Sequence, residues 1–186
     1  MTGRYYKVDN ARYASVTTIL VAIANPELAE WRGRVGAEKA TEISQAAAEY
    51  GTAIHAFCER YARGDRGPFG PPVDSIILPY LDWFNAEVSC ALGVEKLCVS
   101  RRHKFAGTAD LVAVMKDGSV AVVDLKTSKT ALSEDSWGLQ TSAYALALSE
   151  EGIDARRRIV IRLPKNAPGA LYVTEFSEDD LELDQR

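Results

Sequence analysis

Two acidic residues lie inside otherwise apolar segments of this 186-residue chain. Asp110 belongs to the run 106–114, and Asp124 belongs to the run 120–127. An ionised carboxylate in such surroundings is costly unless it is paired or binds a cation. Because Lys126 follows the second acid by two residues, we treat these three charged side chains as one candidate site.

The connection between the two runs decides whether the acids meet. Both runs are typical of β-strands, and the residues between them are typical of a hairpin turn. A two-residue loop would pair Asp110 with Leu125 and send the two acids to opposite faces of the sheet. A three-residue loop, 116–118, would instead place Asp110 opposite Asp124. We predict the three-residue loop, because such loops commonly end in a left-handed residue and Gly118 suits that position.

Two carboxylates and an ammonium group on one patch suit metal-assisted attack on a phosphate. Mg²⁺ prefers oxygen ligands and is often held by one or two carboxylates together with substrate phosphate. A metal-bound water loses its proton more easily, and a nearby lysine can orient that water or stabilise developing charge. By itself, the Asp-x-Lys spacing is a weak signal and is more often a solvated ion pair on a surface hairpin.

The composition excludes several classes of protein. A hydrophobic content of 47% and a charged content of 26% are typical of a soluble globular protein, and a net charge of −4 argues against a strong non-specific nucleic-acid binder. No apolar run is long enough for a membrane span, and the first residues have no signal region, so we expect a cytoplasmic protein with no membrane partner. Cys58, Cys90 and Cys98 lack the spacing of a zinc or iron–sulfur site.

The order of the expected elements predicts a mixed α/β fold, in which a central mixed sheet has helices on both sides. We expect one domain over 1–186, with a helical lead-in at about 15–92 and a core at about 93–176. Expected strands are 5–8, 93–100, 106–114, 120–127, 158–163 and 170–176. Expected helices are 16–23 capped by Ser15, 26–31, 35–63 with a break at Gly51, 76–91, 134–150 capped by Ser133, and a short one from Ser177.

Outside the hairpin, three polar groupings could contribute to a site. His55 and Glu59 share one helix face, as do Gln140 and Tyr144, because each pair is four residues apart. Glu95 lies within an expected strand. A basic cluster, 101–104, precedes the hairpin. Each grouping is also typical of an ordinary surface or core, so the residues alone leave both interpretations open.

Taken together, these motifs resemble the PD-(D/E)XK nuclease superfamily, and in particular its RecB-like exonuclease branch. The resemblance covers roughly 15–163 and implies a restriction-endonuclease-like core. The matching segments are Gly51-x-x-x-His55, Glu95, Gly107-Thr108-Ala109-Asp110, Asp124-Leu125-Lys126-Thr127 and Gln140-x-x-x-Tyr144.

The resemblance implies roles for the matching residues. Asp110, Asp124, His55 and the backbone carbonyl of Leu125 would hold Mg²⁺ or Mn²⁺. Lys126 would position or activate the attacking water.

The remaining residues would assist the same reaction. Glu95 would support the site or a second metal. Gln140 would reach toward Lys126 or the phosphate, with Tyr144 beside it. The predicted contacts with DNA are Arg101, Arg102, Lys104, Thr127 and Lys129.

We therefore predict a metal-dependent deoxyribonuclease, an exonuclease acting on single-stranded or end-containing DNA in recombination, repair or replication. Its expected partners are DNA and recombination or replication proteins. An arch formed by the N-terminal helices and the loop 64–72 would favour free ends. The alternatives are a nuclease-fold DNA-binding or assembly protein with little activity alone, and a structure-specific endonuclease.

Overall fold

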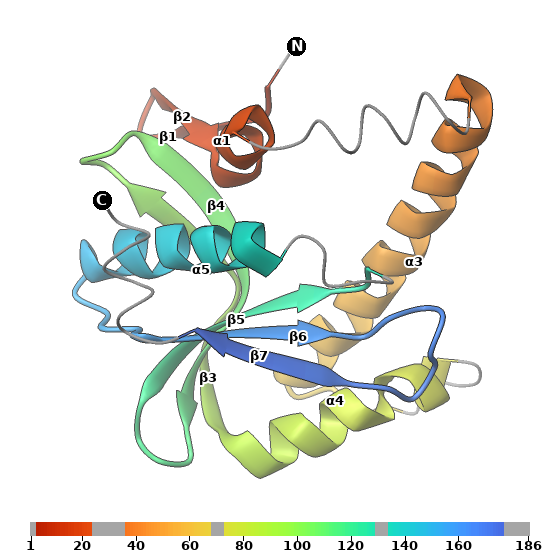
Figure 1. The fold of residues 1–186 in the computed structure, drawn as a ribbon. Coiled ribbons are helices and arrows are strands. Elements are labelled where there is room, and N and C mark those ends of the chain that lie inside the picture. Colours follow the sequence, from red (N-terminus) through yellow and green to blue (C-terminus); the bar gives the residue numbers. More distant parts are fainter. Residues whose placement is uncertain (1–2, 24–35, 68–72, 129–133, 177–186) are drawn as a thin grey trace.

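The structure is a computed structural model, and it describes residues 3–23, 36–67, 73–128 and 134–176 (Figure 1). Several predictions lie outside these residues: the helix at 26–31, the helix from Ser177, the cap at Ser133, part of the loop 64–72, and Lys129. The predicted arch depends on some of them and stays a prediction. Among the described residues, no helix is long and apolar enough to span a membrane.

The described elements form one mixed sheet covered by helices, which confirms the predicted fold class. The strands are β1 (Tyr5–Val8), β2 (Ala11–Ser15), β3 (Val88–Ser100), β4 (Phe105–Met115), β5 (Val120–Lys126), β6 (Arg157–Arg162) and β7 (Tyr172–Phe176). The helices are α1 (Val16–Ile23), α3 (Ala37–Ala62), α4 (Val73–Glu87) and α5 (Glu134–Ser149).

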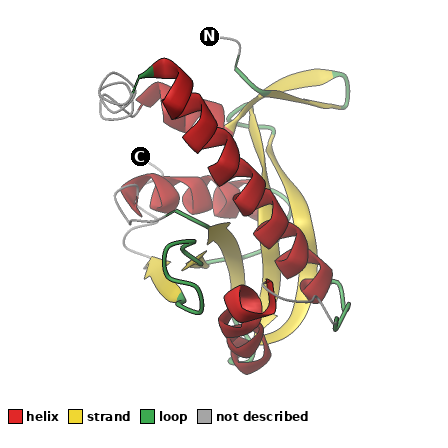
Figure 2. Cartoon of the chain, turned by 90° about the vertical axis from the view of Figure 1, so that its right-hand side faces the viewer, coloured by secondary structure: helices red, strands yellow, loops and turns green. Residues whose placement is uncertain are grey.

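The helices pack on the two faces of the sheet because strand side chains alternate between them. On one face, α3 and α4 pack against Leu111 and Val123, and Figure 2 shows α3 running diagonally across the strands. On the other face, α1 and α5 pack against Val112 and Val122. Each face therefore buries its own apolar cluster.

The central hairpin has the predicted three-residue loop. The paired residues run from Leu111 with Val123 to Val114 with Val120, which is the register that this loop imposes. Gly118 has φ 86°, the left-handed conformation that glycine tolerates. The paired stretch ends one residue before the two acids, and there β4 and β5 separate.

The separation leaves an opening along one edge of β4. β2 pairs with the start of β4 in parallel, at Phe105 and Ala106, whereas β5 pairs with it only from Leu111 onward. The segment 107–110 therefore lies between two different neighbouring strands. This is where the residues of the predicted site come together.

The largest differences from the sequence-based expectations concern β2, α3 and the junction of α4 with β3. β2 was not predicted, although Asp9 and Asn10 form a turn with φ 47° and 62°, the positive values typical of a two-residue hairpin. The predicted break at Gly51 is wrong, since α3 is continuous through it. The helix predicted to reach residue 91 ends at Glu87, where the long strand β3 begins.

Candidate active site

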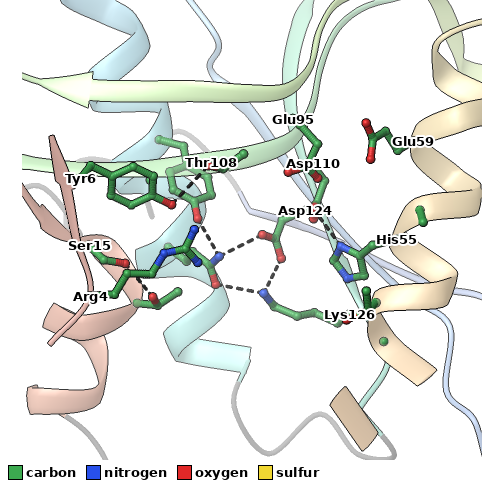
Figure 3. A pocket seen from close by; sticks show the side chains of 17 residues that line it. Arg4, Tyr6, Ser15, His55, Glu59, Glu95, Thr108, Asp110, Asp124 and Lys126 are labelled. Carbon is green, nitrogen blue, oxygen red and sulfur yellow. Dashed lines mark hydrogen bonds and ion pairs between the residues drawn. The ribbon is translucent and has the colours of Figure 1, made fainter. Parts of the chain in front are cut away.

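A cavity of about 540 Å³ occupies the opening beside β4. Its walls come from segments between Arg4 and Tyr144 and from both faces of the sheet, and Figure 3 shows the side chains that point into it. The charged lining residues are Arg4, His55, Glu59, Glu95, Asp110, Asp124 and Lys126. The cavity therefore combines four carboxylates with two permanent cations and a histidine.

Asp110 is held by α3 and by β5 at once. Its Oδ1 lies 2.9 Å from His55 Nδ1, and its Oδ2 accepts a hydrogen bond of 2.7 Å from the backbone amide of Leu125. The side-chain alternation along β4 is interrupted here, because Ala109 and Val112 both join the cluster under α5. Asp110 thus approaches the cavity from the α3 side.

Asp124 approaches the same cavity from the α5 side. Its Oδ1 accepts a hydrogen bond of 3.0 Å from Gln140 Nε2, and its Oδ2 lies 2.5 Å from Lys126 Nζ. The predicted register is correct up to Leu111 and Val123, but the shared sheet face predicted for the two acids is wrong. The side chains reach the cavity from the two sides of the strand separation, because the strands no longer pair at this level.

Gln140 connects the charged residues on the α5 side. Its Oε1 accepts a hydrogen bond of 2.9 Å from Lys126 Nζ, while its Nε2 also donates to the Tyr144 hydroxyl at 2.9 Å. Gln140 is 9% exposed and Tyr144 is 2% exposed, so both are fixed by packing. The amide orients Lys126 and Asp124 relative to each other.

The buried state of Asp124 favours binding of a cation. The residue is only 2% exposed, and burial raises the pKa of its carboxyl, while the charge of Lys126 lowers it and that of Asp110 raises it again. The Lys126 ammonium pairs with Oδ2, but the pKa of Asp124 is still raised overall, so this pair does not fully offset the cost of burial. A divalent ion would offset the cost of burying the charge.

A second grouping of potential ligands lies beside Asp110. One ligand atom each from His55, Glu95 and Asp110 lies within 4.8 Å of the others. Burial lowers the pKa of His55, but the hydrogen bond and charge of Asp110 outweigh it, so the net shift is upward. Burial raises the pKa of Glu95, and the neighbouring carboxylates of Asp110 and Glu59 raise it further. Oxygen and imidazole donors of this kind fit Mg²⁺ or Mn²⁺.

This grouping differs from the predicted ligand set. Asp124 does not belong to it, and Glu95, expected in a supporting role, does. Glu95 has φ 52°, an uncommon backbone conformation for a residue with a side chain, at the point of β3 next to Asp110. Leu125 contributes its amide to Asp110, and its side chain packs on the α3 side.

Two glycines permit the close approach of the elements around the cavity. A Cβ atom at Gly107 would lie 2.4 Å from Tyr144 Cε1, so β4 and α5 could not pack as they do with any larger residue. A Cβ atom at Gly51 would lie 3.1 Å from Thr127 Oγ1. The glycines of both motifs are therefore explained by packing around the site.

The predicted DNA contacts at 101–104 lie away from the cavity. They occupy the turn between β3 and β4 and do not line the cavity. Arg101 pairs with Asp9 at 2.7 Å, and the Arg101 and Arg102 amides donate to Glu150. Their role toward DNA stays a prediction, as does that of Thr127.

Sequence reasoning missed the wall built by the N-terminal hairpin. The cavity is lined opposite His55 by Arg4 and Tyr6 from the β1 segment, with Ser15 at the end of β2 and Thr17 in α1 (Figure 3). The Asp9-Asn10 turn was a signal for the hairpin itself, but not for the parallel pairing of β2 with β4 that places the hairpin at the cavity.

Comparison with known proteins gives a family match over the second part of the chain. The family model for the PD-(D/E)XK nuclease superfamily matches residues 74–185, more than half of the chain. No curated protein matches the chain. A solved structure described as "Crystal structure of SSO0001" has 19% sequence identity and a TM-score of 0.47, and the match covers 92% of this chain and 71% of that one.

Proposed function

Because the chain belongs to the PD-(D/E)XK nuclease superfamily, we propose that it is a metal-dependent deoxyribonuclease that hydrolyses phosphodiester bonds. The observation that carries this proposal is the convergence of Asp110, Asp124, Lys126 and Gln140 on one cavity. A buried carboxylate whose pKa is raised even with a lysine beside it, next to a second acid, suits a cation.

The residues divide the chemistry between them. Asp110, Asp124, His55 and Glu95 would hold Mg²⁺ or Mn²⁺, which when bound lowers the pKa of water and offsets charge on phosphate oxygens. Lys126 is then placed to orient the attacking water or to stabilise the negative charge that develops on the phosphate. Gln140 holds the lysine in position through its 2.9 Å hydrogen bond.

We further propose that the enzyme prefers DNA ends. The cavity is a bounded pocket with walls on both sides, and the cations among its described lining residues are few. Such a site suits one strand entering from an end better than a long duplex lying across a broad basic face. The likeness to the RecB-like exonuclease branch points the same way.

The decisive experiment compares metals and substrates. Purified protein is incubated with end-labelled linear and circular DNA, single- and double-stranded, in Mg²⁺, Mn²⁺ or EDTA. We expect cleavage that needs a divalent metal and is lost in Lys126→Ala, and a preference for linear over circular DNA.

Lys116→Ala is the matched control. Lys116 lies in the hairpin turn, where its Nζ donates to the Asn85 carbonyl at 2.5 Å, and it does not line the cavity. The control should retain activity. Cleavage by Lys126→Ala at the wild-type rate, or no cleavage of any substrate by folded wild type, would overturn the proposal. Efficient cleavage of circular single strands would overturn the preference for ends alone.

A further inference from the structure

The N-terminal hairpin brings a second permanent cation to the cavity, far in sequence from the nuclease motifs. Arg4 lines the cavity on the side opposite His55, and Figure 3 shows its side chain reaching in from that wall. Lys126 is already engaged by Asp124 and Gln140. No carboxylate among the described residues forms an ion pair with Arg4, although four carboxylates line the same cavity.

Arg4 is held in place by contacts that do not neutralise it. Its backbone amide donates to Thr18 Oγ1 at 3.0 Å, and its carbonyl accepts from the Ser15 amide at 3.0 Å. Its guanidinium carbon lies 5.1 Å from the centre of the Tyr6 ring. A cation–π contact orients an arginine and leaves its N–H groups able to bind an anion.

The same support is connected to the catalytic strand. The Tyr6 hydroxyl lies 3.2 Å from Thr108 Oγ1, and Thr108 precedes Asp110 by two residues on β4. A Cβ atom at Gly3 would lie 2.6 Å from Thr18 Cγ2, so the chain before Arg4 is packed tightly against α1. The hairpin that carries Arg4 is therefore tied to the strand that carries Asp110.

We propose that Arg4 is the centre of a metal-independent phosphate subsite, which binds a phosphate of the nucleic-acid strand next to the one that is cleaved. This inference rests on the proposed function. A substrate strand carries one negative charge per phosphate into a cavity rich in carboxylates, and a metal ion held by these acids would offset charge mainly at the cleaved phosphate. An oriented guanidinium on the opposite wall matches the neighbouring phosphate by paired hydrogen bonds. Arg4 is thus a positioning residue for the substrate.

The test compares Arg4→Gln and Arg4→Lys with a control on the same hairpin. Arg12 in β2 stacks over Tyr5 at 4.3 Å, is exposed and does not line the cavity, so Arg12→Gln is the matched variant. Binding of a labelled single-stranded oligonucleotide is measured in EDTA over a range of salt, and cleavage is measured in Mg²⁺ or Mn²⁺. Melting temperatures show whether each variant folds.

We expect Arg4→Gln to weaken binding about 10-fold, the size of one hydrogen-bonded charge. The slope of log affinity against log salt should fall by about 0.7, the value for one phosphate contact on a single strand. In cleavage, KM should rise more than kcat falls. Arg4→Lys should recover part of the affinity, because it restores the charge without the paired geometry.

A substrate with one uncharged methylphosphonate locates the contact. At a single position, the neutral group should weaken wild-type binding and leave Arg4→Gln binding unchanged. If Arg4→Gln and Arg12→Gln bind equally well, or if no methylphosphonate position distinguishes Arg4→Gln from wild type, the subsite is refuted. Because binding is measured in EDTA, this result is separate from the outcome for nuclease activity.

Discussion

Asp124 is a carboxylate that the protein core must accommodate almost without water. It is 2% exposed, and its pKa is raised mainly by burial despite the nearby ammonium of Lys126. Such a residue is costly to the folded chain before any metal binds. The residue proposed to bind the metal is therefore also one whose ionised form destabilises the folded chain.

We expect the neutral variant Asp124→Asn to be more stable than wild type in EDTA at neutral pH. A carboxyl whose pKa is raised by folding binds its proton more tightly in the folded state. Wild type thus loses stability as the pH rises from the unfolded value near 4 through the folded pKa. The melting temperature of the variant should exceed that of wild type by about 2–4 °C for each kcal/mol of relief, and the difference should vanish toward pH 4.

Asp117→Asn is a control for which we expect a change in melting temperature of the opposite sign. Hydrogen bonds from the Ser119 side chain and backbone lower the pKa of this exposed turn residue. Its ionised form therefore stabilises the fold above the unfolded pKa, and the control variant should melt at a lower temperature than wild type.

With Mg²⁺ or Mn²⁺ present, the advantage of Asp124→Asn should shrink or reverse, since the ion stabilises only wild type. A lower melting temperature of Asp124→Asn in EDTA at neutral pH contradicts this account.

At the scale of the elements, short-range patterns predicted what depends on local geometry. The β4–β5 register followed from one turn, because a glycine with positive φ at position 118 selects the three-residue loop. The bounds of β1 and α1 were also predicted correctly. What sequence could not supply was the pairing of β2 with β4, which brings Arg4 and Tyr6 to the site. That parallel pairing joins segments about ninety residues apart, and no local signal encodes it.

The glycine at 107 is the element-scale feature that most directly tests the packing of α5 on β4. We expect Gly107→Ala to destabilise the protein by about 1–3 kcal/mol, because its Cβ would lie 2.4 Å from the buried Tyr144 ring. Displacing the ring also moves the hydroxyl that accepts from Gln140, so activity should fall as well. Chemical denaturation measures the first effect, and cleavage of labelled DNA measures the second.

A double-mutant cycle separates steric conflict from other causes. Tyr144→Leu removes the ring atoms that the new Cβ would meet. Gly107→Ala should then cost less in the Tyr144→Leu background than in wild type. Equal costs in both backgrounds would show that the close approach of β4 and α5 is not what requires glycine.

At the scale of the whole molecule, charge is distributed against tight non-specific binding. The chain carries 22 Lys and Arg residues against 26 Asp and Glu residues. Within the described cavity lining, Arg4 and Lys126 are the permanent cations, and the basic turn 101–104 lies elsewhere on the sheet. Lys104 lies just before β4 and precedes Asp110 by six residues. Six residues of extended strand separate the two positions by about 20 Å. Substrate affinity must therefore come from a few contacts at the site, with the turn reached only by longer strands.

This distribution predicts a shallow salt dependence that changes with the length of the substrate. For two to four phosphate contacts, the slope for single strands is about −1.4 to −2.8, so affinity should fall about 7- to 50-fold between 50 and 200 mM salt. We expect a triple variant, in which glutamine replaces Arg101, Arg102 and Lys104, to bind a short oligonucleotide as wild type does. For a long oligonucleotide, both the affinity and the slope of log affinity against log salt should be smaller. Fluorescence anisotropy with oligonucleotides of increasing length measures all three quantities. Salt-independent binding would contradict the phosphate-contact account. An equal effect of the triple variant on short and long strands would mean that the turn acts on the cavity itself, because a strand confined to the cavity cannot reach it.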